Sequence, residues 1–301
     1  MRNQALFSVV VLGVALLAPA AGHAAATNPR GNNGDLVPTG KGWGVHGPAA
    51  AGKARPVRGS GINYHGGPVM VTGVTVHYIW YQCSQPWSAT QESILDNLGQ
   101  SIGGSPYFNI NSTYYDGSGT NVLNQVARAS DSTDSCSHGT ALSDSAIQAI
   151  VAAQNPTDTN GVYFVMTSQD VNETSGFCTQ YCGWHTHGTI NGRDIKYAFV
   201  GNPARCPSAC TNGTAPPNGD VGADGAASII AHELEEATTD PDLNAWYDNR
   251  GYENADKCAW KFGTTYNNGT GVANMNLGGR DYLIQQNWVN AGKGSCALQY
   301  P

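Results

Sequence analysis

Long apolar runs along this chain indicate the strands of a buried sheet. Residues 69–81 are mostly β-branched or aromatic and predict a strand or a pair of strands. Two shorter runs, residues 161–167 and 195–200, have the same character and predict two core strands. Residues 105–124 are rich in Tyr and in turn-forming residues, a composition that is consistent with a hairpin.

Apolar residues at helical spacing predict three helices. The first begins near residue 88, with Ser88 or Thr90 as its cap, and the second spans residues 142–153 with Ser143 as its N-cap. The third runs from about Gly222 to Thr239 and is ended by Pro241. We therefore predict an α/β (α+β) fold in a single domain over residues 61–301.

The third helix carries the most informative motif of the chain. From Ile229 it reads Ile-Ile-Ala-His-Glu-Leu-Glu-Glu-Ala-Thr-Thr-Asp-Pro, so His232, Glu236 and Asp240 are four residues apart and project from one face. Glu233 lies beside them. An imidazole and a carboxylate one turn apart, with a second carboxylate adjacent, can hold a zinc ion and a general base.

This motif differs from the standard zinc helix, which has His at both ligand positions. Here Glu236 takes the second position, and zinc accepts carboxylate oxygen as a ligand. The alternative is an acidic amphipathic helix in which His232 only caps or packs.

Two further histidines are candidate ligands. His185 and His187 alternate along an extended segment and therefore share a face, an arrangement that suits zinc. The alternative is a polar loop closed by a Cys178–Cys182 bridge.

An acidic loop follows the third helix. Asp256 in this loop would supply a third zinc ligand. Alternatively, hard oxygen donors would hold calcium, drawn from Asp240, Asp242, Asp248, Glu253 and Asp256.

The predicted order of strand, helix, strand, strand and His-Glu helix is similar to that of zincin-type metallopeptidases. In those proteins a twisted sheet packs on a backing helix, and the active helix lies beneath the edge strand. By this analogy we predict a zincin-like twisted mixed sheet with a backing helix and an active-site helix, loop-rich and disulfide-stapled. Fold class alone does not fix function.

The beginning of the chain predicts export. A basic start, an apolar run and small residues over residues 1–24 are typical of a secretory signal peptide, with the cut between residues 24 and 26. Residues 25–60 are rich in Gly, Pro, Asn and Ala and predict a flexible leader or a removable pro-segment. No later segment has the roughly 20 apolar residues of a membrane helix, so we expect a secreted, extracellular protein that does not span a membrane.

Cysteine usage agrees with export. All 8 cysteines follow the signal segment, and an even number in an exported chain implies disulfides. We predict the pairs Cys83–Cys136, Cys178–Cys182, Cys206–Cys210 and Cys258–Cys296. A tetrathiolate zinc site formed by the four middle cysteines is the alternative.

Charge and composition limit the partners. The net charge is −7, only 12% of residues are charged, and no basic cluster is present. Phosphate binding depends on concentrated Lys and Arg, so we do not expect a nucleic-acid partner. The predicted partner is an extracellular polypeptide or a cell-wall polymer, and we expect a monomer.

Many short motifs resemble the phosphate-induced protein 1 (EXORDIUM-like) family, over roughly residues 61–296. They lie at residues 64–70, 77–81, 176–178, 182–185, 197–203, 206–210, 217–225, 244–247, 279–283 and at Cys296. The resemblance implies a secreted protein, associated in plants with the cell wall and with growth responses. It implies no biochemical activity.

The resemblance also implies a difference at the metal-type helix. Plant members carry small and apolar residues at the positions of His232, Glu233 and Glu236, and Asn at the position of Asp240. This chain would then belong to a catalytic branch of the family, or its acidic helix would be a local elaboration.

Together these patterns predict a secreted zinc-dependent hydrolase, a metallopeptidase first of all. His232 and Glu236 would bind zinc, with His185, His187, Asp240 or Asp256 completing the site. Zinc would lower the pKa of its water to near ~7, and Glu233 would be the general base. The alternative is a non-catalytic extracellular protein that acts at the cell wall or cell surface, with a structural metal or none.

Overall fold

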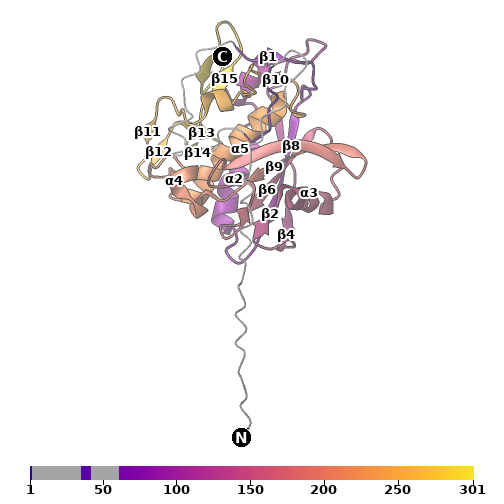
Figure 1. Cartoon of the computed structure of the whole chain (residues 1–301). Coiled ribbons are helices and arrows are strands. Elements are labelled where there is room, and N and C mark those ends of the chain that lie inside the picture. The colour runs from indigo at the N-terminus through magenta and orange to yellow at the C-terminus, as the bar shows by residue number, and fades with distance from the viewer. Residues whose placement is uncertain (2–34, 42–60) are drawn as a thin grey trace.

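The centre of the molecule is a twisted mixed sheet (Figure 1). A computed structural model describes Met1, residues 35–41 and residues 61–301. The predicted signal segment therefore lies outside the described residues, apart from Met1. The strand order is β3-β2-β6-β9-β8, and β4 also pairs with β2. The bounds are β2 (Val74–Tyr81), β3 (Val126–Arg128), β4 (Ser132–Asp134), β6 (Gly161–Thr167), β8 (Gly183–Ile190) and β9 (Arg193–Val200).

The last strand of this order runs against the others. β2, β3, β4, β6 and β9 pair in parallel, whereas β8 pairs with β9 antiparallel. Asn191 and Gly192 join β8 to β9 with φ values of 50° and 75°, as a two-residue hairpin turn requires. Every residue of β6 is buried, as expected for the middle of a sheet covered on both faces.

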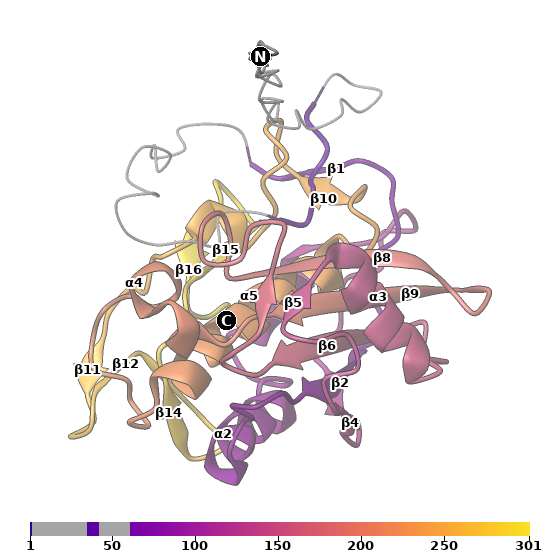
Figure 2. The same cartoon turned by 60° about the horizontal axis from the view of Figure 1, so that its bottom comes forward.

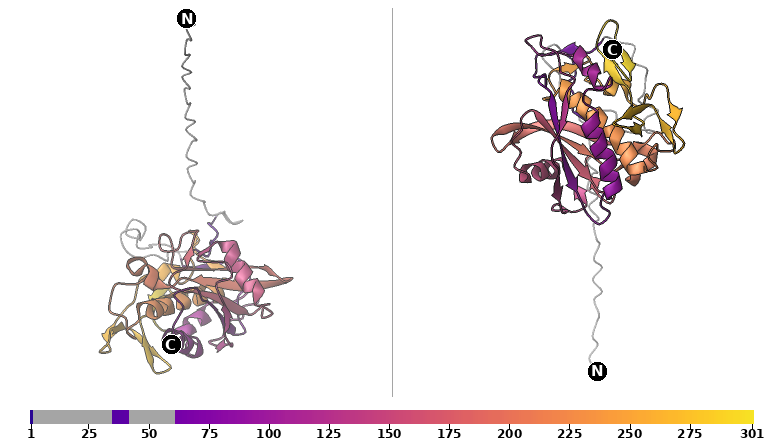
Figure 3. Two further views of the ribbon diagram at one scale, coloured as in Figure 1. Left: turned by 90° about the horizontal axis from the view of Figure 1, so that it is seen from below. Right: turned by 180° about the vertical axis from the view of Figure 1, so that it is seen from behind.

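Three helices cover the sheet. They are α2 (Ala89–Ser101), α3 (Asp144–Ala153) and α5 (Val221–Thr239). Ser88 caps α2 in a capping box with Gln91, and Ser143 caps α3 through the amide of Ala146. Figure 3 shows α2 beside α5, in agreement with their contacts. Figure 2 shows α3 on the other face of the sheet.

The remaining elements are short and lie around this core. The 3₁₀ helices and the one-turn helix are η1 (Phe108–Thr113), η2 (Pro203–Arg205), α4 (Pro207–Cys210) and η3 (Asp256–Cys258). The strands are β1 (Asn63–Tyr64), β5 (Ala141–Leu142), β7 (Asn172–Glu173), β10 (Trp246–Tyr247), β11 (Tyr266–Asn267), β12 (Val272–Ala273), β13 (Met275–Leu277), β14 (Arg280–Tyr282), β15 (Asn287–Val289) and β16 (Ser295–Ala297).

Most of the predicted elements agree with the structure, and two differ. Residues 69–73 precede β2 and are not a strand. The predicted hairpin over residues 105–124 is mainly the 3₁₀ helix η1, followed by one isolated bridge between Tyr115 and Asn121. The Asp116 carboxylate accepts the amides of Ser118 and Thr120, which closes this loop locally without a second strand.

The disulfides correct part of the predicted pairing. Cys83–Cys136 and Cys258–Cys296 form as predicted. The local pairs Cys178–Cys182 and Cys206–Cys210 are wrong, because Cys178 bonds Cys206 and Cys182 bonds Cys210. Cys206 precedes the one-turn helix α4 and Cys210 ends it, so their sulfur atoms lie on the same side of the turn, 3.6 Å apart, and each bonds a cysteine of the segment before β8. With all four cysteines in disulfides, none is left as a thiolate zinc ligand.

These features make an α/β fold with a twisted mixed sheet, few long helices and four disulfides. Among the described residues, no helix has the length and apolar character needed to cross a membrane.

Candidate metal centre

The metal-type helix is α5, and it is buried along most of its length. The Asp220 side chain caps its N-terminus through the amide of Ala223. Its buried face includes charged residues: His232 is 6% exposed, Glu233 4% and Glu236 1%. Charged groups are rarely buried this deeply unless they are paired, protonated or bound to a metal.

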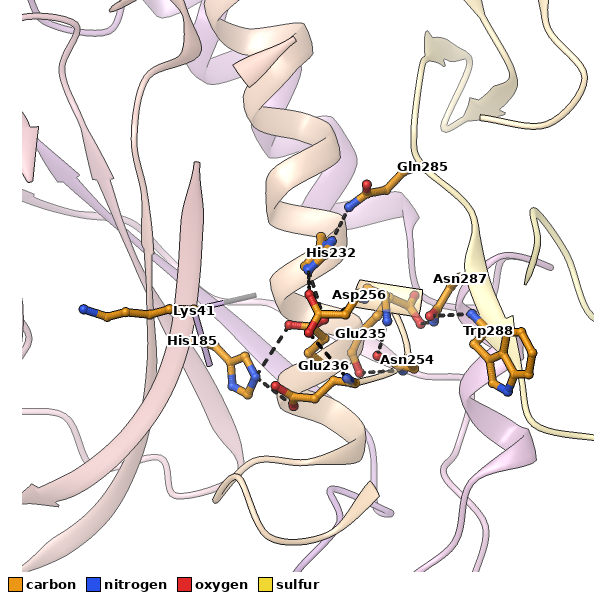
Figure 4. A network of polar contacts seen from close by, with 12 residues as sticks. Lys41, His185, His232, Glu235, Glu236, Asn254, Asp256, Gln285, Asn287 and Trp288 are labelled. Atoms are coloured by element: carbon orange, nitrogen blue, oxygen red, sulfur yellow. Dashed lines mark hydrogen bonds and ion pairs between the residues drawn. The ribbon is translucent and has the colours of Figure 1, made fainter. Parts of the chain in front are cut away.

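Three of the predicted ligands meet at one point (Figure 4). His232 Nε2 lies 2.9 Å from Glu236 Oε1 and 3.5 Å from Asp256 Oδ1. Asp256 begins η3, and its backbone amide donates to Glu236 Oε1 at 3.0 Å. The Cys258–Cys296 disulfide holds the end of this short helix. The segment after α5 thus places the Asp256 carboxylate next to His232 and Glu236 of the helix.

A second group shares Glu236 with the first. His185 Nε2 lies 3.1 Å from Glu253 Oε1 and 3.8 Å from Glu236 Oε2. The two oxygens of Glu236 therefore face the two imidazoles. His185 is 1% exposed, and its Nδ1 has no hydrogen-bond partner among the described residues. We call His185, His232, Glu233, Glu236, Glu253 and Asp256 the acidic cluster.

Two other predicted ligands lie outside the acidic cluster. His187 contacts Asp194 at 2.8 Å and Asp242 at 3.4 Å, in a separate and more exposed group beside Lys196. His185 and His187 therefore do not share one site, although both belong to β8. Asp240 is at the C-terminus of α5, where its Oδ1 accepts the amides of Asn244 and Ala245.

The acids proposed for calcium do not all converge: Glu253 and Asp256 lie in the acidic cluster, and the others make separate contacts. Asp248 forms an ion pair with Lys257 at 2.9 Å. Asp242 faces His187 and Lys196 instead. Burial raises the pKa of Asp240 to about 7, and its Oδ1 already accepts two backbone amides at the end of α5.

Glu233 is the member of the acidic cluster that, with His232, forms part of the wall of a cleft. It lines this cleft with His232, Gln285 and Trp260, and Gly183 from the start of β8 faces it. Glu233 Oε2 has no hydrogen-bond partner among the described residues. A side chain at Gly183 would collide with Ile229 and come within 3.1 Å of Glu233 Oε1, so glycine allows β8 to approach the helix.

Burial dominates the electrostatics of the carboxyl groups. It raises the pKa of Glu236 to about 7, and the nearby charge of Asp256 adds to this shift. Burial also raises the pKa of Glu233 and Glu253 well above the ordinary range. Without a cation, these groups would take up protons.

The two imidazoles respond in opposite directions. Burial lowers the pKa of His185 to about 3, so this ring is neutral at neutral pH. Burial disfavours the charged form of His232 as well, but Glu236 and Asp256 outweigh it and raise its pKa well above the ordinary value. One imidazolium therefore faces several carboxyl groups.

Gln285 is a partner that the sequence did not reveal. Its amide nitrogen contacts His232 Nδ1, and its Oε1 accepts the Trp260 amide at 2.9 Å. Such a second partner fixes the orientation of the ring. Gln285 follows β14 in an apolar stretch, and no periodicity or spacing links it to α5.

Comparisons with known proteins identify the family. Residues 62–296 match the family model described as the phosphate-induced protein 1 conserved region. Protein EXORDIUM-like 3 of Arabidopsis thaliana is 34% identical, with 75% of this chain and 80% of the relative covered. Protein EXORDIUM-like 5 of the same plant is 33% identical, with 75% of each chain covered. No solved structure matches significantly. The chain belongs to the phosphate-induced protein 1 family, which confirms the predicted resemblance.

Proposed function

We propose that this member of the phosphate-induced protein 1 family is a secreted zinc-dependent hydrolase that cleaves polypeptides. The observation that carries the proposal is the position of Glu233. This buried carboxyl group lines a cleft next to His232, and one of its oxygens has no partner among the described residues.

The residues present fit a zinc ion. His232, Glu236 and Asp256 offer one nitrogen and two oxygens, and the candidate ligand atoms lie within 4.8 Å of one another. Zinc accepts these donors, and catalytic zinc sites use three protein ligands. A divalent cation would also offset the excess of buried carboxyl groups.

One local adjustment accompanies this fit. Binding through His232 Nε2 requires the ring proton to be on Nδ1, where it needs an acceptor. A half-turn of the Gln285 amide would present Oε1 to Nδ1, at the expense of the hydrogen bond that the Trp260 amide now donates to Oε1. Side-chain amide orientation is set by such hydrogen-bond networks.

The chemistry divides between the metal and Glu233. Bound zinc would polarise a scissile carbonyl and activate water. Glu233 is one residue beyond His232 and would accept a proton from the attacking water, then pass it to the leaving amine. To act as this base Glu233 must be ionised; burial raises its pKa, and a cation bound beside it would oppose that shift.

The surrounding fold is compatible with this proposal. α5 contacts the antiparallel edge strand β8, and α2 lies beside it. A zincin-like arrangement would have the same relationship between edge strand, active helix and backing helix. This analogy supports the position of the site and not its chemistry.

Export is the second part of the proposal. Four disulfides and the EXORDIUM-like relatives are consistent with an extracellular protein. Cleavage after residues 24 to 26, a leader over residues 25–60 and a monomeric single domain over residues 61–301 belong to this proposal. No nucleic-acid partner is part of it.

The competing function is a non-catalytic extracellular protein acting at the cell wall or cell surface. One observation favours it: His232, Glu236 and Asp256 already contact one another directly. Such a network can stabilise a core without a metal.

Hydrolysis with and without a chelator separates the two functions. The purified protein is incubated with casein, a peptide library and wall polymers, then treated with chelator and restored with zinc. We expect peptide cleavage that the chelator abolishes and zinc restores. Absence of turnover on every substrate, with zinc supplied, would leave the non-catalytic function.

A further inference from the structure

We call residues 35–41 the strap; its last two residues, Gly40 and Lys41, lie against the outer edge of β8. β9 pairs with β8 on its inner side, and the outer backbone groups of β8 are at the edge of the sheet. On that side the His185 amide donates to the Gly40 carbonyl oxygen at 3.1 Å. The strap thus makes a backbone contact of the kind by which an extended peptide adds to a sheet edge.

Gly40 allows this close approach. It has a φ of +65°, and a Cβ atom there would be 1.9 Å from the His185 carbonyl oxygen. No other residue fits without displacing the strap or the strand. The contact is therefore specific for a residue without a side chain.

The next residue places its charge against a half-exposed carboxylate on the surface. Lys41 Nζ lies 2.5 Å from Asp144 Oδ2 and 2.7 Å from Ser175 Oγ. It is also 5.3 Å from the ring centres of Tyr181 and Trp184. A carboxylate with two aromatic faces is suited to a basic side chain. Figure 4 shows Lys41 on the side of α5 from which His185 approaches.

The strap is antiparallel to β8, and its C-terminal end points toward the cleft. Gly40 faces His185, and Lys41 reaches Trp184 and Tyr181, which come earlier in the chain. Gly183, one residue before Trp184, borders the cleft that contains Glu233. A peptide that continued in this direction would approach Glu233. At its other end the strap is fixed by the Leu36 amide, which donates to the Asn249 carbonyl at 3.3 Å.

We propose that the outer edge of β8 is a binding site for an extended polypeptide with a glycine followed by a basic residue, and that the strap occupies this site in cis. The strap thereby competes with any other chain for the same backbone groups and the same Asp144 carboxylate. This inference rests on the proposed function for the fate of a bound peptide, but its binding step is independent of catalysis.

The full-length Gly40→Val variant tests the site. Its added side chain collides with the His185 carbonyl and should release the strap. Hydrogen exchange at the His185 amide should become at least about tenfold faster, the loss of one hydrogen bond of about 1.4 kcal/mol. Gly269→Val is the matched control, because Gly269 also has positive φ, a Cβ there meets nothing within 4 Å, and it lies between β11 and β12, outside β8 and the strap. Exchange at His185 should be unchanged in the control.

A synthetic peptide provides the second arm. The heptapeptide Asp-Leu-Val-Pro-Thr-Gly-Lys, the sequence of the strap, should bind Gly40→Val and restore protection of His185. It should bind the parent protein at least about tenfold more weakly, because the strap fills the site. The same peptide with Ala in place of Lys should bind more weakly to the variant.

The outcomes separate this inference from the hydrolase. Unchanged exchange in Gly40→Val, or no peptide binding to it, would overturn the strap site and leave the metal centre unaffected. Faster exchange and peptide binding, without hydrolysis by either protein, would support the strap site and contradict the hydrolase. Faster exchange, peptide binding and increased casein cleavage by Gly40→Val would support both.

Discussion

The Oδ1 atom of Asp256 lies 3.5 Å from the Nε2 atom of His232, although the two residues belong to different elements. The sequence left His185, His187, Asp240 and Asp256 as alternatives for the third ligand. Of these, Asp256 is in the same group as His232 and Glu236. His185 faces the other oxygen of Glu236.

We expect the purified protein to bind about one equivalent of zinc at His232, Glu236 and Asp256. His232→Ala should lose the metal, because removing one of three ligands leaves an incomplete site. His187→Ala should retain it, because His187 lies in a separate group. Elemental analysis after mild purification, followed by titration with zinc, measures both. No uptake by the parent protein would exclude the proposed centre.

Glu233→Gln should separate metal binding from catalysis. The amide keeps the shape of the side chain but is not a base, so hydrolysis should fall at least about 100-fold while zinc is retained. Glu235→Gln is the control, since Glu235 is equally buried on α5 but contacts Asn287 on another side. Initial rates on a cleaved peptide give the comparison. Equal rates for Glu233→Gln and its parent would remove Glu233 from the mechanism.

The crossed disulfides give a prediction that needs no substrate. Peptide mapping without reduction should recover Cys178 linked to Cys206 and Cys182 linked to Cys210. Replacing Cys178 and Cys206 together by Ser should lower the free energy of unfolding by about 2–3 kcal/mol, because the Cys182–Cys210 bridge remains and the removed bridge closes only the two short segments between the bridges. Denaturant unfolding measures this loss. Fragments that link Cys178 to Cys182 would show that the local pairing is correct after all.

Asp170 gives a prediction about pH. Burial opposes its charge, but hydrogen bonds from Ser84, Gln85 and Ser168 lower its pKa to about 2. Because the folded pKa lies below the unfolded value of about 3.9, the charged form stabilises the fold above pH 3.9. This contribution is lost as the pH falls toward 2. Asp170→Asn should therefore unfold at lower temperature than its parent at pH 7, with the difference closing near pH 2. Melting curves across this range test it, and a constant difference would contradict it.

The elements of the core were predictable because their signals are local. The apolar run of β6 and the serine caps of α2 and α3 are properties of neighbouring residues. The motif of α5 likewise placed His232 and Glu236 one turn apart, and the structure has them 2.9 Å apart. Family membership followed from many short motifs along the chain.

The features that the sequence did not predict depend on contacts between distant segments. The separation of His185 from His187 arises because Glu253 faces one ring and Asp194 the other. The position of Gln285 against His232 depends on the path of the C-terminal strands. The disulfide pairing depends on two segments that face each other. No periodicity or motif spacing in the sequence indicates any of these contacts.

The Cys178–Cys206 and Cys182–Cys210 disulfides join the segment before β8 to the segment before α5, so completion of the cleft depends on oxidation. Cys182 and Cys210 both border the cleft, and Gly183 and Thr211 beside them form part of its wall. In a reducing compartment these two segments would be joined by packing alone. We therefore expect the cleft to take its final shape only after oxidation, so that a copy retained in the cytosol would fold its sheet and still have an unfinished site.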